Sequence, residues 1–175
     1  MKRILGLIIG VFLVSYLVNS FFFFQSDVNG VSMQPTLTSG DKIIINRLSK
    51  IQRNDLIMFT SPKNKNDHLI KRVVGMPGDT VRFDHYQLYI DNVKIDEPYL
   101  TKINKTPRKN DSTKSYTDFN ITKDNKIPKN KYLVLGDNRR FSNDSRYFGL
   151  IEDKDILGKA TLKVYPFSKT NFFID

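Results

Sequence analysis

The stretch Gly30-Val31-Ser32-Met33-Gln34-Pro35-Thr36-Leu37 begins shortly after the only long apolar run of the chain has ended. This position sets one serine at a short, fixed distance from whatever the apolar run contacts. A serine before a proline is common in turns, so Ser32 alone is only a candidate. A catalytic role for this serine requires a partner elsewhere in the chain.

The apolar run covers residues 4–24 and contains no charged side chain. At about 1.5 Å of rise per residue, a helix of this length crosses the roughly 30 Å hydrocarbon core of a bilayer. Lys2 and Arg3 precede it without an acidic residue, so the positive-inside tendency places the N-terminus in the cytoplasm. We expect residues 1–25 to form a single-pass type II anchor.

A cleaved secretory signal is the alternative for this run. Such a signal has a shorter apolar core and ends in small side chains. Here the run ends in four phenylalanines, residues 21–24. The sequence therefore favours a retained anchor.

Residues 26–175 have the length of one well-buried domain with an elaboration. The sequence contains no cysteine, which excludes disulfides, thiolate metal sites and a thiol nucleophile. A net charge of +10 is typical of proteins that bind nucleic acids, but the sequence contains no DNA- or RNA-binding signature. Attraction to anionic lipid headgroups explains a basic outward-facing domain with fewer assumptions.

Runs of β-branched and aromatic residues bounded by Gly, Pro, Ser and Asp predict strands. The expected strands cover residues 41–47, 56–60, 70–75, 81–83, 87–95, 132–135 and 158–165. Asp91-Asn92 can supply a tight hairpin turn, and Pro166 should end the last strand. No segment after residue 25 has a helical period, so we expect a mainly β, antiparallel domain. Residues 101–131, rich in Lys, Asn and Thr, are expected to form an inserted surface cap.

Activation of a serine requires a base. His68 and His85 are the only histidines, and both lie among polar residues typical of a solvated surface. A lysine can act instead, provided that it is neutral. An ordinary lysine has a pKa of about 10.4, so burial must lower that pKa by about 3 units, of order 4 kcal/mol.

Lys71 has suitable surroundings for such a shift. In an alternating strand it shares a face with Leu69 and Val73, which would direct it toward the apolar side of a sheet. A snorkelling edge-strand lysine is the alternative interpretation. An inward-facing lysine is a candidate base.

Four segments, in order behind an anchor, resemble motifs of the bacterial type I signal peptidases, which also carry an N-terminal membrane segment. The segments are residues 32–37, 40–41, 71–79 and 136–146. The resemblance extends from the anchor to about Gly149 and omits the segment 101–131. It implies a β-sheet serine endopeptidase, without metal or cofactor, that removes signal peptides from exported preproteins.

The resemblance also implies roles for single residues. Ser32 matches the nucleophile and Lys71 the general base, while Ser142 matches a serine that hydrogen-bonds the lysine. Asp144 and Arg146 match supporting positions. Gly30 stands where some members have a serine hydroxyl in the oxyanion hole, which implies the backbone variant of the Gram-positive branch.

By the same resemblance, the partners are preproteins emerging from the export machinery, cut after small residues, and the lipid bilayer. We expect a monomer that binds no nucleic acid. A self-cleaving repressor-type peptidase is a rival, but it lacks an anchor and the segment 136–146. The other alternative is an anchored homologue with weak or no catalysis that binds or regulates secretion.

Overall fold

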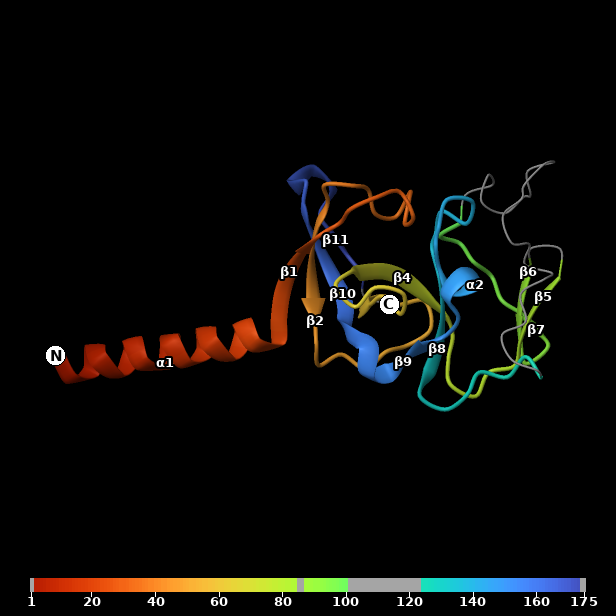
Figure 1. Ribbon diagram of the computed structural model, residues 1–175. Coiled ribbons are helices and arrows are strands. Elements are labelled where there is room, and N and C mark those ends of the chain that lie inside the picture. Colours follow the sequence, from red (N-terminus) through yellow and green to blue (C-terminus); the bar gives the residue numbers. More distant parts are fainter. Residues whose placement is uncertain (1, 85–86, 101–123, 174–175) are drawn as a thin grey trace.

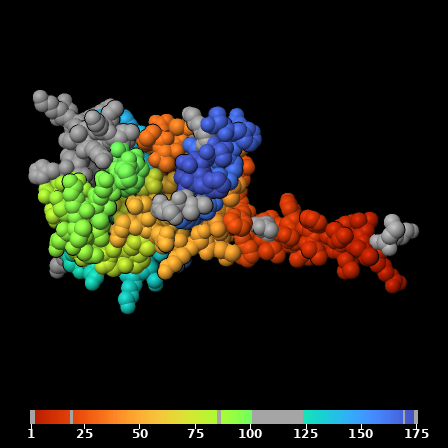
Figure 2. Space-filling model, turned by 180° about the vertical axis from the view of Figure 1, so that it is seen from behind, coloured from red at the N-terminus to blue at the C-terminus, as the bar shows by residue number. Residues whose placement is uncertain are grey.

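The structure is a computed structural model that describes residues 2–84, 87–100 and 124–173 (Figure 1). An N-terminal helix stands away from a mainly β domain (Figures 1 and 2). The elements are α1 Lys2–Phe22, β1 Phe23–Asp27, β2 Lys42–Asn46, β3 Leu56–Thr60, β4 His68–Gly75, β5 Val81–Asp84, β6 Gln87–Ile90, β7 Val93–Lys94, β8 Lys131–Leu135, α2 Ser145–Phe148, β9 Ile151–Glu152, η3 Asp153–Asp155, β10 Ile156–Tyr165, η4 Phe167–Lys169 and β11 Asn171–Phe172.

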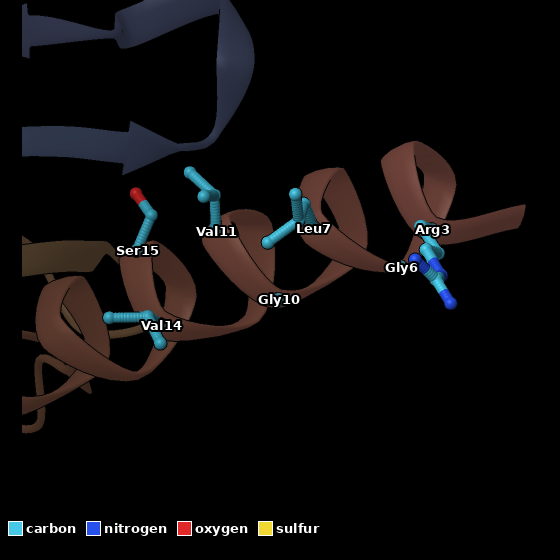
Figure 3. Close-up of a pocket in the computed structure, with 7 residues that line it drawn as sticks. All are labelled: Arg3, Gly6, Leu7, Gly10, Val11, Val14 and Ser15. Carbon is cyan, nitrogen blue, oxygen red and sulfur yellow. The ribbon is translucent and has the colours of Figure 1, made fainter. Parts of the chain in front are cut away.

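Helix α1 is long and apolar enough to cross a membrane, and none of its apolar window is buried against the rest of the described chain. A groove runs along one side of this helix (Figure 3). Gly6 and Gly10 lie in the groove, and apart from their chain neighbours and the backbone of the helix itself, nothing lies within 4 Å of the place where their missing Cβ atoms would be. The backbone therefore forms part of the groove's surface.

The helix ends earlier than the apolar run predicts. It stops at Phe22, and Phe23 already belongs to β1, which pairs with β2 in antiparallel register. The Arg47 guanidinium lies 4.6 Å from the ring centre of Phe24. Aromatic residues occur in strands as well as in helices, and pairing with β2 makes Phe23 and Phe24 part of a strand here. As a result, the sheet begins directly where the anchor ends.

The main sheet has the strand order β1-β2-β10-β3-β4-β8-β9, with β11 beside β10 (Figure 1). All its pairings are antiparallel, which confirms the expected fold class. The observed strands match the predicted ones within a few residues, and the short β1, β9 and β11 were not predicted. The sheet brings β4, which carries Lys71, next to the segment between β1 and β2, which carries Ser32.

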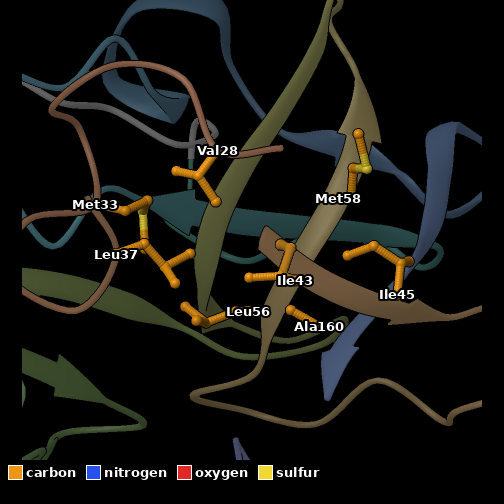
Figure 4. Close-up of a cluster of buried hydrophobic side chains, with 8 residues drawn as sticks. All are labelled: Val28, Met33, Leu37, Ile43, Ile45, Leu56, Met58 and Ala160. Carbon is orange, nitrogen blue, oxygen red and sulfur yellow. The ribbon is translucent and has the colours of Figure 1, made fainter. Parts of the chain in front are cut away.

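The core beside this chain contains residues from the opening stretch itself (Figure 4). Met33 and Leu37 are buried among residues of the neighbouring strands, including Ile43, Leu56 and Met58. Val28, which precedes the serine, is buried in the same cluster, so apolar side chains before and after Ser32 hold its turn.

A second sheet, β5-β6-β7, is formed by the predicted hairpin region. Asp91 and Asn92 have φ angles of 49° and 66°, the left-handed values that a tight hairpin turn requires. This confirms the predicted turn. The predicted strand 87–95 is therefore two strands, and its first part also pairs with β5.

Of the segment predicted to be an inserted cap, residues 101–123 lie outside the described residues. The remainder returns along the second sheet: Lys126 bridges Thr80, and Ile127 is buried against Val74 and Val81. This end of the segment therefore contributes to a core, which the sequence analysis did not expect. Its single large apolar side chain gave too little pattern to predict burial.

Leu37 provides a test of how much the turn contributes to stability. It has no exposed surface, so Leu37→Ala is expected to lower the free energy of unfolding by about 2–5 kcal/mol because it leaves a cavity. The same change at Leu48, which is 66% exposed, serves as the control and should have little effect. Chemical denaturation of the full chain in detergent measures both; equal effects would contradict the packing described.

Candidate active site

The structure brings Ser32 and Lys71 into contact. Lys71 Nζ donates hydrogen bonds to Ser32 Oγ at 2.8 Å and to the Ile70 carbonyl at 2.8 Å. The register of β3 and β4 sets Lys71 opposite Ile57, whose side chain packs with Leu69 and Val73. Lys71 is 3% exposed, so the prediction of an inward-facing lysine is confirmed.

Burial is the main influence on the lysine. It lowers the pKa of Lys71 from 10.5 to about 8, although the negative charges of Asp144 and Asp137 raise it. The pKa falls somewhat less than the 3 units expected from the sequence, because those carboxylates favour the ammonium. Because pH 7 lies about one unit below this pKa, roughly a tenth of the Lys71 amine is neutral at that pH.

Asn138 holds the backbone on which Ser32 sits. Its N–H donates to the Ser32 carbonyl at 3.0 Å, and its side-chain Nδ2 donates to the Val31 carbonyl at 3.0 Å. Two hydrogen bonds from one residue fix both position and direction of this short segment. Asn138 belongs to the segment 136–146 that resembles the family, and it contacts the backbone of Ser32 rather than the hydroxyl or the amine.

A second set of hydrogen bonds holds the same turn, and its acceptor is the fully buried Asp137. Arg72 donates to it through Nε at 2.8 Å and NH2 at 2.6 Å, and Thr36 Oγ1 donates to it at 2.5 Å. Because Arg72 follows Lys71 in β4, this ion pair joins the strand of the lysine to the turn of the serine. This role of Arg72 was not predicted from the sequence.

Asp144 and Arg146 close the loop that carries Asn138. Arg146 Nε and NH2 donate to the two Asp144 oxygens at 2.8 Å each, and NH2 also donates to the Arg139 carbonyl at 2.7 Å. Asp144 accepts from the Gly136 N–H at 3.0 Å and caps the single-turn helix α2. Both residues are buried, in the supporting position that the resemblance implies.

Ser142 does not make the expected hydrogen bond to Lys71. Its hydroxyl is buried, and within the described residues it has no hydrogen-bond partner. It lies against Gly136, where an added Cβ would meet Ser142 Oγ at 2.2 Å and the Ser32 carbonyl oxygen at 2.5 Å. Lys71 instead donates to the carbonyl of Ile70, its neighbour in β4. Pattern matching placed Ser142 near the site but could not predict which acceptor the amine takes.

Gly30 has a φ angle of +95°, a value that L side chains rarely adopt. Space for a side chain is open there, so the backbone angle, not crowding, favours glycine.

A pocket of about 90 Å³ opens beside Ser32 and Lys71, and its lining includes Gly30, Met33 and Met58. His68 also lines it; its side chain is exposed, as the sequence indicated, but its place at the pocket was not predicted. His85 lies outside the described residues. On the same measure one water molecule needs roughly 10–15 Å³, so the pocket is several waters in size and suits a small side chain.

A serine hydroxyl in contact with a buried lysine amine is the arrangement of a serine hydrolase whose base is lysine. The family described as signal peptidase, peptidase S26, matches residues 1–165. The chain therefore belongs to the signal peptidase family, a family of serine endopeptidases, and the resemblance seen in the sequence is confirmed.

Three similar proteins illustrate the relationship. Signal peptidase IB of Staphylococcus aureus strain COL is 38% identical over 98% of this chain and 95% of its own length. Signal peptidase I V of Bacillus subtilis strain 168 is 39% identical over 78% of this chain and 82% of its own. The crystal structure of a signal peptidase I from Enterococcus faecalis V583 aligns with a TM-score of 0.56 and 37% identity, over 65% of this chain and 98% of that one.

The lowered pKa of Lys71 predicts the pH dependence of peptide-bond cleavage. If the neutral amine is the base, kcat should rise with pH as the proton leaves Lys71, with a midpoint at about 8, and level off above it. Turnover of a synthetic preprotein-derived peptide between pH 6 and 10 measures this. A midpoint near 10.5, or a rate that falls as pH rises from 6 to 9, would contradict it.

Proposed function

We propose that Ser32 is the nucleophile and Lys71 the general base of a peptidase that removes signal peptides from exported preproteins. The observation that carries this proposal is the 2.8 Å contact between Ser32 Oγ and Lys71 Nζ, made by a buried amine at the edge of a small pocket.

The reaction follows from the contact. Ser32 Oγ attacks the scissile carbonyl carbon while its proton passes to the lone pair of Lys71 Nζ, and the backbone N–H of Ser32 stabilises the oxyanion. Nζ then gives the proton to the leaving amine as the C–N bond breaks, which leaves an ester on Ser32. Water, deprotonated by Lys71, attacks the ester and returns the free serine.

The surroundings of the dyad support a small-residue substrate held as a strand. The pocket of about 90 Å³ fits a small side chain before the scissile bond. Strand β8 pairs with β4 only from Arg72 onward, so in the described chain the part of β4 from His68 to Lys71 pairs with β3 alone. An extended preprotein segment can add to that edge through backbone hydrogen bonds.

The anchor supports a site on the outer face of the membrane. Lys2 and Arg3 orient α1 with its start in the cytoplasm, and β1 follows the helix without a linker. Residues 26–175 then form the extracytoplasmic peptidase domain, with residues 101–131 as its inserted cap. We further propose a monomer whose basic surface faces lipid headgroups and binds no nucleic acid.

The test compares wild type with Ser32→Ala in cleavage of a purified preprotein by the full chain in detergent. Wild type should cut after a small-x-small sequence, and Ser32→Ala should lose at least about a thousandfold in kcat because no other group replaces the nucleophile. Ser168→Ala, on the exposed η4 turn, is the matched control and should retain the wild-type rate.

Two outcomes would count against the proposal. Equal rates for wild type and Ser32→Ala would exclude Ser32 as the nucleophile. Binding of the preprotein by wild type without cleavage would favour the alternative, an anchored homologue that binds or regulates secretion.

A further inference from the structure

Glu97 is a buried acid outside every motif that the sequence resemblance uses. It is 4% exposed and forms an ion pair with Arg139, which is 3% exposed. Both Arg139 NH1 and NH2 donate to the carboxylate. A charge is buried only when it is paired, so Glu97 and Arg139 require each other.

The partner of Glu97 belongs to the loop behind the nucleophile. Arg139 Nε donates to the Gly136 carbonyl at 3.1 Å, and the next residue back, Asn138, holds the carbonyls of Val31 and Ser32. Glu97 therefore reaches the Ser32 turn through two residues of one short loop.

Tyr99, from the same segment as Glu97, contacts β4, the strand that carries Lys71. Its hydroxyl donates to Glu97 Oε1 at 2.8 Å, and its ring lies under the Arg72 guanidinium, 4.0 Å from the ring centre. Burial and the neighbouring Glu97 raise the pKa of Tyr99, so the hydroxyl stays protonated and can donate. Arg72 is adjacent to Lys71 and pairs with Asp137.

A turn keeps Glu97 and Tyr99 in this geometry. The Leu100 N–H donates to the Glu97 carbonyl at 3.1 Å, and Pro98 follows Glu97, where its fixed φ favours a turn. Leu100 is buried below it. Residues 97–100 are thus a compact turn that presents two side chains toward the site.

We propose that Glu97 and Tyr99 are positioning residues for the proposed Ser32–Lys71 reaction, because together they tie the loop behind Ser32 to the strand that carries Lys71. Neither touches the reacting atoms. Glu97 orients the loop through Arg139, and the Tyr99 ring supports the Arg72 guanidinium that pairs with Asp137. Together they set the distance between hydroxyl and amine.

Glu97→Gln tests the charge while keeping the shape. Turnover of the preprotein peptide per folded molecule should fall about tenfold in kcat, with little change in KM, because the loop behind Ser32 loosens. Glu152→Gln, the same substitution at the only other glutamate, which lies half-exposed in β9, is the control and should keep the wild-type kcat.

The pH profile of Glu97→Gln separates positioning from a purely structural role. The charged groups around the amine are the acids Asp137 and Asp144, which pair with Arg72 and Arg146. Asp137 lies in the loop that Arg139 holds, so loosening this loop weakens the influence of the Asp137 charge on Lys71, which disfavours the ammonium. The midpoint of the rate should move to lower pH; a residue needed only for stability would leave it unchanged.

Tyr99→Phe and Tyr99→Leu test the ring and keep the inference testable if Glu97→Gln does not fold. Phe retains the ring under Arg72 and should lose about threefold in kcat or less, whereas Leu should lose about tenfold. Tyr165→Leu, at a half-exposed site on β10, is the control.

Folded Glu97→Gln and Tyr99→Leu variants with wild-type kcat and pH midpoint would overturn the inference. Absence of cleavage by wild type is a different result: it would overturn the proposed function, and the inference with it. Near-UV circular dichroism of each variant confirms the amount of folded protein.

Discussion

The buried amine of Lys71 is the constraint on which the site depends. Removing an ammonium from water costs several kcal/mol, and the fall of its pKa from 10.5 to about 8 expresses that cost. The amine stays close to a serine only because β3 and β4 hold its backbone, while the Ile70 carbonyl and Ser32 hydroxyl satisfy its donors. A more exposed lysine at this place would remain charged and could not accept a proton.

The ion pairs around the amine limit how far nearby acids raise its pKa. Asp137 and Asp144 both favour the ammonium, yet each is paired with an arginine, Arg72 or Arg146. An unpaired carboxylate in either place would hold the proton on Lys71 more strongly. The two arginines thus have two effects. They hold the segments that carry the dyad in place, and they neutralise the carboxylates of Asp137 and Asp144 through which they do so.

Much of this arrangement could be predicted from the sequence, because local patterns decide it. The alternation around Lys71 predicted an inward side chain, and Asp91-Asn92 predicted a turn. Contacts between distant segments could not be predicted in the same way. Nothing next to Glu97 in the chain indicates that it meets Arg139. The hydrogen bond expected between Ser142 and Lys71 is absent, and the acceptors of the Lys71 amine are the Ile70 carbonyl and Ser32 Oγ. The end of α1 was also misplaced, since aromatic residues suit both a helix and a strand.

The most direct test of Lys71 as the base is an NMR titration of its ε-amine in the full chain in detergent. The lysines carry ¹³C labels, and the signal of Lys71 is assigned by its loss in the Lys71→Met variant. We expect this amine to titrate at about 8, because burial outweighs Asp144 and Asp137. A midpoint near the ordinary value of 10.5 would contradict this role for Lys71, since almost none of the amine would then be neutral near pH 7.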